Sequence, residues 1–316
     1  MPDEDLPVAR TSLLTVLVPV LNESETIPLF FARLEPVLCE VMKTYKVNLV
    51  FLNNASTDDS LNAISRLRKK FDFIFVITMS ANVGYQKSVE CGLRNTRGDI
   101  FVVIDVDCED PPEMIHDFIK EYENGFDLVY GLRHDRTERR VIKFMRKVFY
   151  HLIRQVADDE ILLYMAEFAL FTSEVRDATI ESLDSFPFLR SSMARVGFKR
   201  IGIAYKRQPR IAGKTHYNFY RMSIFAIASI LSSTTFPLRL PIYLMPFWVL
   251  TSVSSVWAYF HSDNFVFLLI LVTVTTVYIG GGISSIALYL ARTYKNGLQR
   301  PNYYIHKRYS HLQDNN

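Results

Sequence analysis

The sequence predicts an α/β domain with a mostly parallel sheet, followed by two helices long enough to cross a membrane. Short runs of β-branched and aromatic residues alternate with longer helical stretches up to residue 130, as in sheets whose strands are joined by helices. Charged residues almost disappear between residues 236 and 290, where only Arg239 and Asp263 remain. At 316 residues, the chain is long enough for one large domain and a smaller unit behind it.

The predicted elements of the sheet domain alternate between strand and helix. Strands are expected at residues 13–20, 47–52, 73–78, 100–104 and 128–130, and helices at residues 27–45, 57–70, 85–96 and 112–124. Residues 56–59 read Ser-Thr-Asp-Asp, an N-cap with an acidic first turn, and Pro112 opens the last of these helices. This alternation indicates a parallel sheet covered on both faces, with its ligand site outside the carboxyl ends of the strands.

Two further helices are expected after Arg133. Residues 142–156 form a helix with a basic start, which either faces solvent or contacts phosphates or lipid headgroups. Residues 224–233 are apolar and precede the long apolar region, which suits a helix lying in the membrane interface.

The long apolar region divides at residues 261–264 into two stretches, 241–260 and 265–290. Each reaches the roughly 18–20 residues needed to cross the hydrocarbon core of a bilayer. Lysine and arginine are absent from the connector and present on both outer sides, so both ends are expected in the cytoplasm. We therefore expect an integral membrane protein with a cytoplasmic domain at 1–220, an interfacial helix and linker at 221–240, a two-helix anchor at 241–291 and a basic cytoplasmic tail at 292–316.

Composition argues against several other classes of protein. A net charge of +3 is too small to indicate a nucleic-acid partner, and the basic residues beside the apolar stretches fit anionic lipid better. Cys39, Cys91 and Cys108 form no paired or metal-type spacing, so neither a disulfide framework nor a zinc site is expected. Residues 1–12 are acidic and polar, so no signal peptide is expected there.

Residues 100–113 carry the strongest chemical signal. A hydrophobic strand runs directly into Asp105 and Asp107, and Glu109 and Asp110 follow. Carboxylates gathered at a strand end repel one another unless a cation neutralises them, and Mg²⁺ or Mn²⁺ held by one or two carboxylates and a diphosphate would do so. The alternative is that Asp110 only caps the helix that begins at the prolines. We expect a divalent metal site with Asp105, Asp107 and Glu109 as ligands.

A series of short motifs resembles the inverting glycosyltransferases of family 2, which have the GT-A fold. Within that family the resemblance is to the polyprenyl-phosphate glycosyltransferases, the group of dolichyl-phosphate mannose synthase and the bactoprenol glucosyltransferases. It covers residues 14 to about 300. The matching segments are Leu-Val-Pro-Val-Leu-Asn-Glu at 17–23, Ser-Thr-Asp-Asp-Ser at 56–60, Asn-Val-Gly at 82–84, Gly-Leu at 92–93, Gly-Asp at 98–99, Ala-Glu-Phe at 166–168, Phe-Leu-Arg at 188–190, Tyr205, Arg207, Arg210, Ala-Gly at 212–213, Tyr217 and Pro-Leu-Arg at 237–239.

The resemblance implies transfer of one hexose, with inversion, from a UDP- or GDP-linked sugar to a polyprenyl phosphate at the cytoplasmic face of a membrane, expected to be a bacterial inner membrane. The catalytic residues that it implies are Asp105, Asp107, Glu167, Arg207 and Arg210. The implied nucleotide-sugar contacts are Pro19, Asn22, Glu23, Asn53, Asn54, Asn82, Gly84, Asp105 and Val106. The implied acceptor-phosphate contacts are Arg133, Arg190, Arg207, Arg210 and Lys214, because forked or cationic donors suit phosphate oxygens.

Several positions depart from the pattern of the family. Asn53 and Asn54 stand where an aspartate pair is usual, which leaves the identity of the nucleotide base open because an amide both donates and accepts hydrogen bonds. Glu109 replaces a common glutamine and Glu167 a common aspartate. Ala169 and His216 replace a common arginine and lysine.

Other functions stay open at this stage. One is a membrane-bound enzyme of the same family that extends a lipid-linked glycan through a sugar hydroxyl. Another is a non-catalytic nucleotide-sugar-binding partner, which the altered positions would suit. A processive polysaccharide synthase would carry a Q-x-x-R-W motif, and the chain has none. Glycines at 280–282 could also pack the apolar helices against a second copy, giving a homo-oligomer.

Overall fold

The computed structural model describes residues 12–133, 165–181, 187–211 and 234–312. The chain divides into two compact units. The first comprises Met1–Lys143, Leu162–Tyr217 and Pro301–Asn316, and the second comprises Phe144–Ile161 and Asn218–Arg300. The helices expected at 142–156 and 224–233, and the expected phosphate contact Lys214, lie outside the described residues.

The first unit is built on one sheet, which contains seven strands in the described part of the chain. Their order across the sheet is β3-β2-β1-β4-β6-β5-β7. The strands are β1 (Leu13–Val20), β2 (Lys46–Asn53), β3 (Ile74–Thr78), β4 (Ile100–Val103), β5 (Leu128–Arg133), β6 (Met165–Thr172) and β7 (Arg200–Tyr205). Among these strands only the pairs that involve β6 are antiparallel, so the predicted mostly parallel sheet is confirmed.

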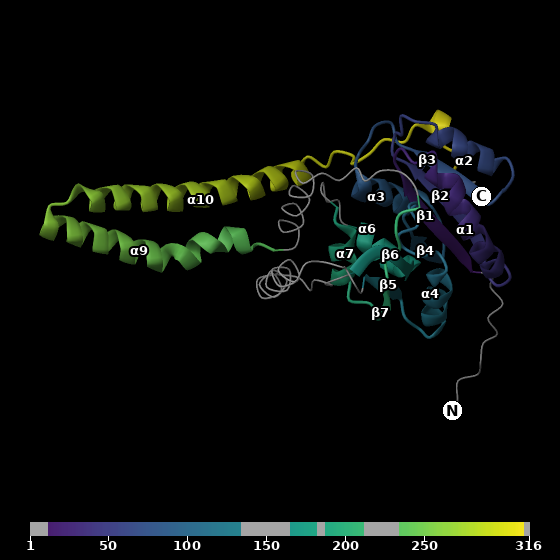
Figure 1. Ribbon diagram of the computed structural model, residues 1–316, viewed down its shortest axis with the longest axis horizontal. Helices are drawn as coiled ribbons and strands as arrows, with labels where there is room; N and C mark the ends of the chain where they lie inside the picture. The colour runs from purple at the N-terminus through teal and green to yellow at the C-terminus, as the bar shows by residue number, and fades with distance from the viewer. Residues whose placement is uncertain (1–11, 134–164, 182–186, 212–233, 313–316) are drawn as a thin grey trace, which may run out of the picture. The chain divides into compact units, whose positions relative to one another are not determined.

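Helices cover both faces of this sheet (Figure 1). One face carries α1 (Thr26–Val41), α2 (Ser60–Arg68) and α4 (Met114–Glu123), and the other carries α3 (Tyr85–Asn95), α6 (Ser173–Ile180) and α7 (Leu189–Arg195). Neighbouring residues of a buried parallel strand point to opposite faces, which is why these strands are apolar throughout.

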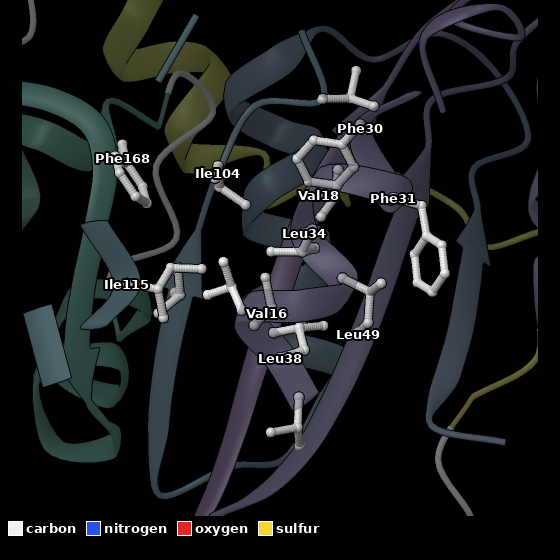
Figure 2. Close-up of a cluster of buried hydrophobic side chains, with 14 of the residues drawn as sticks. Val16, Val18, Phe30, Phe31, Leu34, Leu38, Leu49, Ile104, Ile115 and Phe168 are labelled. Carbon is white, nitrogen blue, oxygen red and sulfur yellow. The ribbon is translucent and has the colours of Figure 1, made fainter. Parts of the chain in front are cut away.

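The larger apolar core lies between α1 and the sheet. Figure 2 shows Phe30, Leu34 and Leu38 of α1 against Val16 and Val18 of β1. All five side chains are fully buried. This packing fixes β1 in the centre of the sheet and therefore fixes where the loop after β1 emerges.

The sequence-based bounds differ from the structure at several elements. The helix expected from residue 57 begins at Ser60, because Asp58 binds the backbone N–H of Ser24 at 3.1 Å and that of Ser60 at 3.0 Å instead of continuing the helix. The strands β6 and β7 were not predicted. They pair with β4 and β5, from which long stretches of chain separate them, so local periodicity gave no signal.

The second unit contains two long helices, α9 (Phe236–Ser262) and α10 (Phe265–Gly297). Both are long and apolar enough to span a membrane, with mean hydropathies of 1.3 and 2.2. They lie side by side as a hairpin (Figure 1), and Trp248 stacks on Tyr278 with ring centroids 4.9 Å apart. Phe260 is 79% exposed and Val277 70% exposed, so most of their apolar surface has no protein cover. The two predicted apolar helices are confirmed, and each is longer than the predicted stretch.

Residues 301–312 return to the sheet of the first unit. The backbone N–H of His311 donates to the carbonyl of Val76 at 2.7 Å, and the N–H of Val76 donates back at 3.1 Å. The N–H of Ser80 donates to the carbonyl of Tyr304 at 2.8 Å. The end of the predicted tail at 292–316 is therefore paired with the edge strand β3 and belongs to the first unit. The other predicted domain boundaries stay predictions.

Candidate active site

The candidate site residues gather at one edge of the sheet. Parallel strands β1, β2, β4, β5 and β7 end there, and the antiparallel strand β6 begins there. The sheet order reverses between β1 and β4, and ligands of α/β sheets bind outside the carboxyl ends of strands at such a point. The loops after β1, β2 and β4 contain Asn22, Ala55 and Cys108, which have positive φ angles of 56°, 54° and 56°.

Pro19 and Val106 line this edge without offering a polar side chain. Both are buried. Register pairs β1 with β4 only from Leu14 to Leu17, so the missing N–H of Pro19 costs no hydrogen bond with β4. The pairing of β1 with β4 ends before Pro19, close to the residues for which the sequence predicted nucleotide contacts.

Asp105 lies at the end of β4 among other carboxylates. The hydroxyl of Tyr85 donates to its Oδ1 at 2.8 Å. Burial, then the charges of Asp110 and Asp107, raise the pKa of Asp105 to about 7, although the hydrogen bond from Tyr85 opposes this. A carboxyl group that keeps its proton near neutral pH is one where a cation could take the place of the proton.

Asp107 faces two cations from the segment after β7. Its Oδ1 accepts the backbone N–H of Glu109 at 3.1 Å, and its Oδ2 lies 3.6 Å from Nη1 of Arg210. Burial raises the pKa of Asp107, and Arg210 and Arg207 oppose that effect. Glu109 forms an ion pair with Arg207.

The predicted set of three metal ligands is not assembled in the structure. Among the residues that the structure describes, no three His, Cys, Asp or Glu side chains converge as a metal site. Asp105, Asp107 and Glu109 therefore do not form one by themselves. The donor set still fits Mg²⁺ or Mn²⁺ held by Asp105 and Asp107, because such ions commonly take one or two carboxylates, water and substrate phosphates.

The segment 206–211 lies across the turn that bears these carboxylates. The N–H of Gln208 donates to the carbonyl of Glu109 at 2.9 Å, and the N–H of Ile211 donates to the carbonyl of Asp107 at 3.2 Å. These two backbone contacts bring Arg207 and Arg210 beside the carboxylates, although the two stretches are far apart in the sequence. The structure thus brings Arg207 and Arg210 together with the acidic turn after β4.

The loop after β1 is tied to the loop after β2. The Oδ1 of Asn22 accepts the N–H of Thr57 at 2.8 Å, and the N–H of Asn22 donates to Oγ of Ser56 at 3.0 Å. Glu23 accepts the hydroxyl of Thr26 at 2.7 Å and forms an ion pair with Arg210. In this structure both predicted nucleotide contacts therefore hold protein loops together.

The amides of Asn53 and Asn54 also bind within the protein. The Oδ1 of Asn53 accepts the N–H of Ser56 at 3.1 Å. The Nδ2 of Asn54 donates to Oδ1 of Asn82 at 3.0 Å, and its Oδ1 accepts the N–H of Val83 at 2.9 Å. Asn82 also accepts the N–H of Gly84 at 3.0 Å, and Gly84 has a φ of 85° as it starts α3. The structure thus brings all four residues together as a frame between the loops after β2 and β3.

Glu167 lies near the start of β6 and is held by two donors. Nε of Arg190 lies 2.7 Å from its Oε1, and Nε2 of Gln86 lies 3.0 Å from the same oxygen. The Oε1 of Gln86 accepts the N–H of Leu189 at 3.0 Å, which ties α3 to α7. Arg190 therefore has a carboxylate partner, and its predicted contact with acceptor phosphate stays a prediction.

Arg133, another predicted phosphate contact, is engaged with a buried carboxylate. Its Nη2 lies 3.1 Å from Oδ2 of Asp110, and its Nε donates to the hydroxyl of Tyr205 at 3.2 Å. Tyr205 donates in turn to Asp110, which is 1% exposed. This arrangement joins the ends of β5 and β7 to the turn after β4 and leaves Arg133 as a structural cation here.

Three residues of the site were not predicted from the sequence: Arg33, Tyr85 and Gln86. Asp110 and Tyr205 were noticed in the acidic turn and in a motif, but no binding role was predicted for them. Tyr85 and Gln86 directly follow the Asn-Val-Gly motif, and Asp110 follows the predicted metal ligands, so position next to a motif was the available signal. Arg33 gave none, because it is a partly buried residue on an ordinary amphipathic helix.

Comparison with known proteins decides the family. Residues 15–179 match the model of glycosyl transferase family 2. The chain belongs to this family. The family 2 chain is 30% identical over 307 residues to the prophage bactoprenol glucosyl transferase homolog of Escherichia coli (strain K12), covering 92% of this chain and 98% of that protein. It is 30% identical over 310 residues to the bactoprenol glucosyl transferase of Shigella phage SfX, covering 93% and 99%.

One solved structure that is similar to the family 2 chain is glucosyl-3-phosphoglycerate synthase from Mycobacterium tuberculosis. The TM-score is 0.49 and the identity is 19%, over 70% of this chain and 79% of that chain. The resemblance predicted from the motifs is confirmed, and so is the fold class: a mostly parallel sheet of the GT-A type followed by two apolar helices. The chain is a glycosyltransferase by family.

Proposed function

We propose that this glycosyltransferase transfers one hexose from a UDP- or GDP-linked sugar to a polyprenyl phosphate such as undecaprenyl or dolichyl phosphate. The observation that carries the proposal is the meeting of Asp107 and Glu109, in the turn that also holds Asp105, with Arg207 and Arg210 at one sheet edge. Carboxylates suit a cation that binds diphosphate, and guanidinium groups suit phosphate oxygens. Relatives named for bactoprenol match nearly the full length of the chain, including the region of the two apolar helices.

Each residue of the site has a proposed part in the reaction. Asp105 and Asp107 would hold Mg²⁺ or Mn²⁺, which when bound supplies positive charge to the diphosphate leaving group. Arg207 and Arg210 orient phosphate oxygens of donor or acceptor. Glu167 orients the sugar or an arginine, because its Oε1 already accepts hydrogen bonds from Arg190 and Gln86.

The acceptor phosphate itself would be the nucleophile. With a second pKa near 6, a phosphate monoester is mostly dianionic at neutral pH and needs no strong base from the protein. Its oxygen attacks the anomeric carbon as the bond from that carbon to the diphosphate oxygen breaks. A single in-line displacement of this kind inverts the anomeric centre.

The membrane arrangement belongs to the same proposal. The helices α9 and α10 cross the membrane, joined by a short connector without lysine or arginine, and both flanks are basic. We place the catalytic unit in the cytoplasm and the anchor in a bacterial inner membrane. The relatives include phage and prophage proteins of bacteria, which supports this choice.

The test is a panel of UDP- and GDP-sugars incubated with purified full-length protein and a short polyprenyl phosphate, with Mn²⁺, with Mg²⁺ or with EDTA. We expect one donor to yield an acid-labile lipid-phosphate sugar, and the product to disappear with EDTA. An acid-stable product on a lipid-linked glycan would instead show transfer to a sugar hydroxyl. Calorimetry that detects no metal-dependent nucleotide-sugar binding would favour a non-catalytic partner.

A further inference from the structure

The acidic and basic side chains of the candidate site neutralise one another. Arg207 pairs with Glu109, and Arg210 pairs with Glu23 and lies near Asp107. The carboxylate side chains are 18%, 10% and 15% exposed, so these pairs are only partly screened by water. A cation that binds Asp107 must therefore compete with an arginine already there.

The two carboxylates beside Arg210 hold it with unequal strength. Nη2 of Arg210 makes a direct hydrogen bond to Oε1 of Glu23. The closest approach to Asp107 is 3.6 Å, from Nη1 to Oδ2, which is beyond hydrogen-bond distance. The contact with Asp107 is thus the weaker of the two and the easier to replace.

Glu23 is itself fixed by the surrounding loops. Its Oε2 accepts the hydroxyl of Thr26 at 2.7 Å, and its N–H donates to Oγ of Ser60 at 2.8 Å. Its carbonyl accepts the N–H groups of Thr26 and Ile27, both at 3.0 Å, at the start of α1. Glu23 therefore offers Arg210 a rigid anchor at the entrance to the first helix.

The backbone that carries Arg210 is also braced. The segment 206–211 makes two backbone hydrogen bonds with the turn after β4. It is also held through Gln208, whose Oε1 accepts a hydrogen bond from Nη1 of Arg33 at 2.8 Å. Arg33 is clamped by Glu113 through two contacts of 2.7 Å. A change of partner by Arg210 thus needs rotation of its side chain and no movement of the segment.

We propose that Glu23 is a positioning residue that holds Arg210 while a divalent cation replaces Arg210 at Asp107. The cation takes the place of the guanidinium group beside Asp107. Glu23 keeps Arg210 at the edge of the site, where the N–H groups of its guanidinium can face the phosphates. The identity of those phosphates rests on the proposed function. The exchange at Asp107 rests only on the ion pairs described above.

The experiment measures binding of Mn²⁺ alone, by electron paramagnetic resonance of the free ion, to full-length protein in detergent. Arg210→Gln removes the competing cation, so the affinity for Mn²⁺ should rise about threefold or more, the change expected for one partly screened ion pair. Glu23→Gln frees Arg210 to turn fully to Asp107, so the affinity should fall by a similar factor. In the Glu23→Gln, Arg210→Gln double variant the effect of the first change should vanish, leaving the affinity of Arg210→Gln.

A matched control is Arg66→Gln, because Arg66 forms a 3.1 Å ion pair with Asp59 at an exposed place on α2. It should leave Mn²⁺ affinity unchanged. Arg207→Gln is a second variant for the case in which Arg210→Gln fails to fold, and it should raise the affinity by freeing Glu109 beside Asp107.

Three results would overturn the exchange. They are no binding of Mn²⁺ by the parent protein, an unchanged or lower affinity in the arginine variants, and an equal loss from Glu23→Gln with and without Arg210. The last result would make Glu23 a metal ligand in its own right. If the variants show the predicted Mn²⁺ affinities but the protein transfers no sugar to lipid phosphate, the exchange at Asp107 holds and the proposed acceptor is wrong. If the protein transfers sugar to lipid phosphate but the affinities do not follow the prediction, the proposed acceptor holds and the exchange is wrong.

Discussion

Residues in strained conformations surround the candidate site. Asn22, Ala55 and Cys108 adopt the left-handed backbone region, which costs a residue with a side chain roughly 1–2 kcal/mol. Asn22 is held there by Ser56 and Thr57. Such strain persists only where neighbouring contacts compensate for it, and it brings the loops after β1, β2 and β4 to one place.

Asp105 shows that the site is arranged for binding at the expense of stability. Its pKa is raised to about 7 by burial and by Asp110 and Asp107. We expect Asp105→Asn to stabilise the metal-free protein by about 1 kcal/mol or more at pH 8, because an amide removes the repelled charge. The amide oxygen can still accept the hydroxyl of Tyr85.

Thermal unfolding at pH 8 in EDTA measures this effect, and the same variant should lose nearly all transfer activity. Asp72→Asn is the control, since Asp72 is exposed and precedes β3, at the end of the sheet away from the site. A variant that is less stable than the parent protein would mean that the charge of Asp105 is stabilised by contacts that outweigh the repulsion.

The cysteines should differ in reactivity. Burial raises the pKa of Cys91 to about 12 and that of Cys108 to about 11, whereas Cys39 is exposed on α1. The thiolate is the reactive form, so only Cys39 should react readily with a thiol reagent in the folded protein. Mass spectrometry after brief iodoacetamide treatment, with a denatured sample as control, would detect the modified sites, and rapid modification of Cys91 would contradict the expectation.

At the scale of elements, the segment 206–211 acts as a short cover over the turn after β4. Its backbone contacts with Asp107 and Glu109 place two arginines beside the carboxylates. The contact between Arg33 of α1 and Gln208 explains why an arginine far from the motifs matters for the site. The arrangement of arginines and carboxylates therefore depends on the segment after β7 as much as on the turn after β4.

The C-terminal residues protect the edge strand β3. Residues 301–312 pair with Val76 and Ser80, and the hydroxyl of Thr78 donates to the carbonyl of Tyr309 at 2.7 Å. Asn302 donates to the buried Glu90 at 2.9 Å, and Asn95 donates to the hydroxyl of Tyr303 at 2.9 Å. An uncovered edge strand is prone to pair with other chains.

Truncation after Arg300 should therefore destabilise the first unit and favour aggregation. We expect the melting temperature to fall by about 4 °C or more, the shift that roughly 1–2 kcal/mol causes in a domain of this kind. Truncation after Leu312 removes only residues outside the described range and is the matched control. Equal melting temperatures for the two truncated proteins would show that the segment adds no stability.

At the scale of the whole molecule, a sheet domain with buried apolar cores is combined with a helical hairpin that has little apolar surface buried. In a bilayer, lipid would cover that surface, as the hydropathy of α9 and α10 requires. Built on the backbone, a Cβ at Gly280 or Gly281 would meet no atom of the described chain within 4 Å. These glycines are not needed for the packing of the hairpin, and a homo-oligomer through them stays a prediction.

The proposed topology places the connector between α9 and α10 on the outer side of the membrane. Asp263→Cys in a Cys39→Ser background should react with a membrane-impermeant maleimide in intact cells, because Asp263 is the C-cap of α9. The parent protein should react at Cys39 only after lysis. Modification of Cys39 in intact cells, or labelling of the Asp263→Cys variant only after lysis, would reverse the proposed orientation.

Local pattern was enough to predict most of the first five strands, the four helices that alternate with them and the two apolar helices. Those features depend on periodicity and on length, which neighbouring residues determine. The carboxylate cluster after β4 was also visible, because its members are adjacent in the chain. The helix start at Ser60 was missed because Asp58 binds a loop from another part of the chain.

The sequence by itself determined the family, the acidic turn at Asp105 and Asp107, and two helices fit for a membrane. Only the tertiary structure decided the partners of those residues. Arg210 and Glu23 are separated by 187 positions, and Ser310 and Thr78 by 232. The order of the strands determines which loops meet at such separations, and that order arises when helices bury the two faces of the sheet. The pairing of arginines with carboxylates is thus a property of the folded chain.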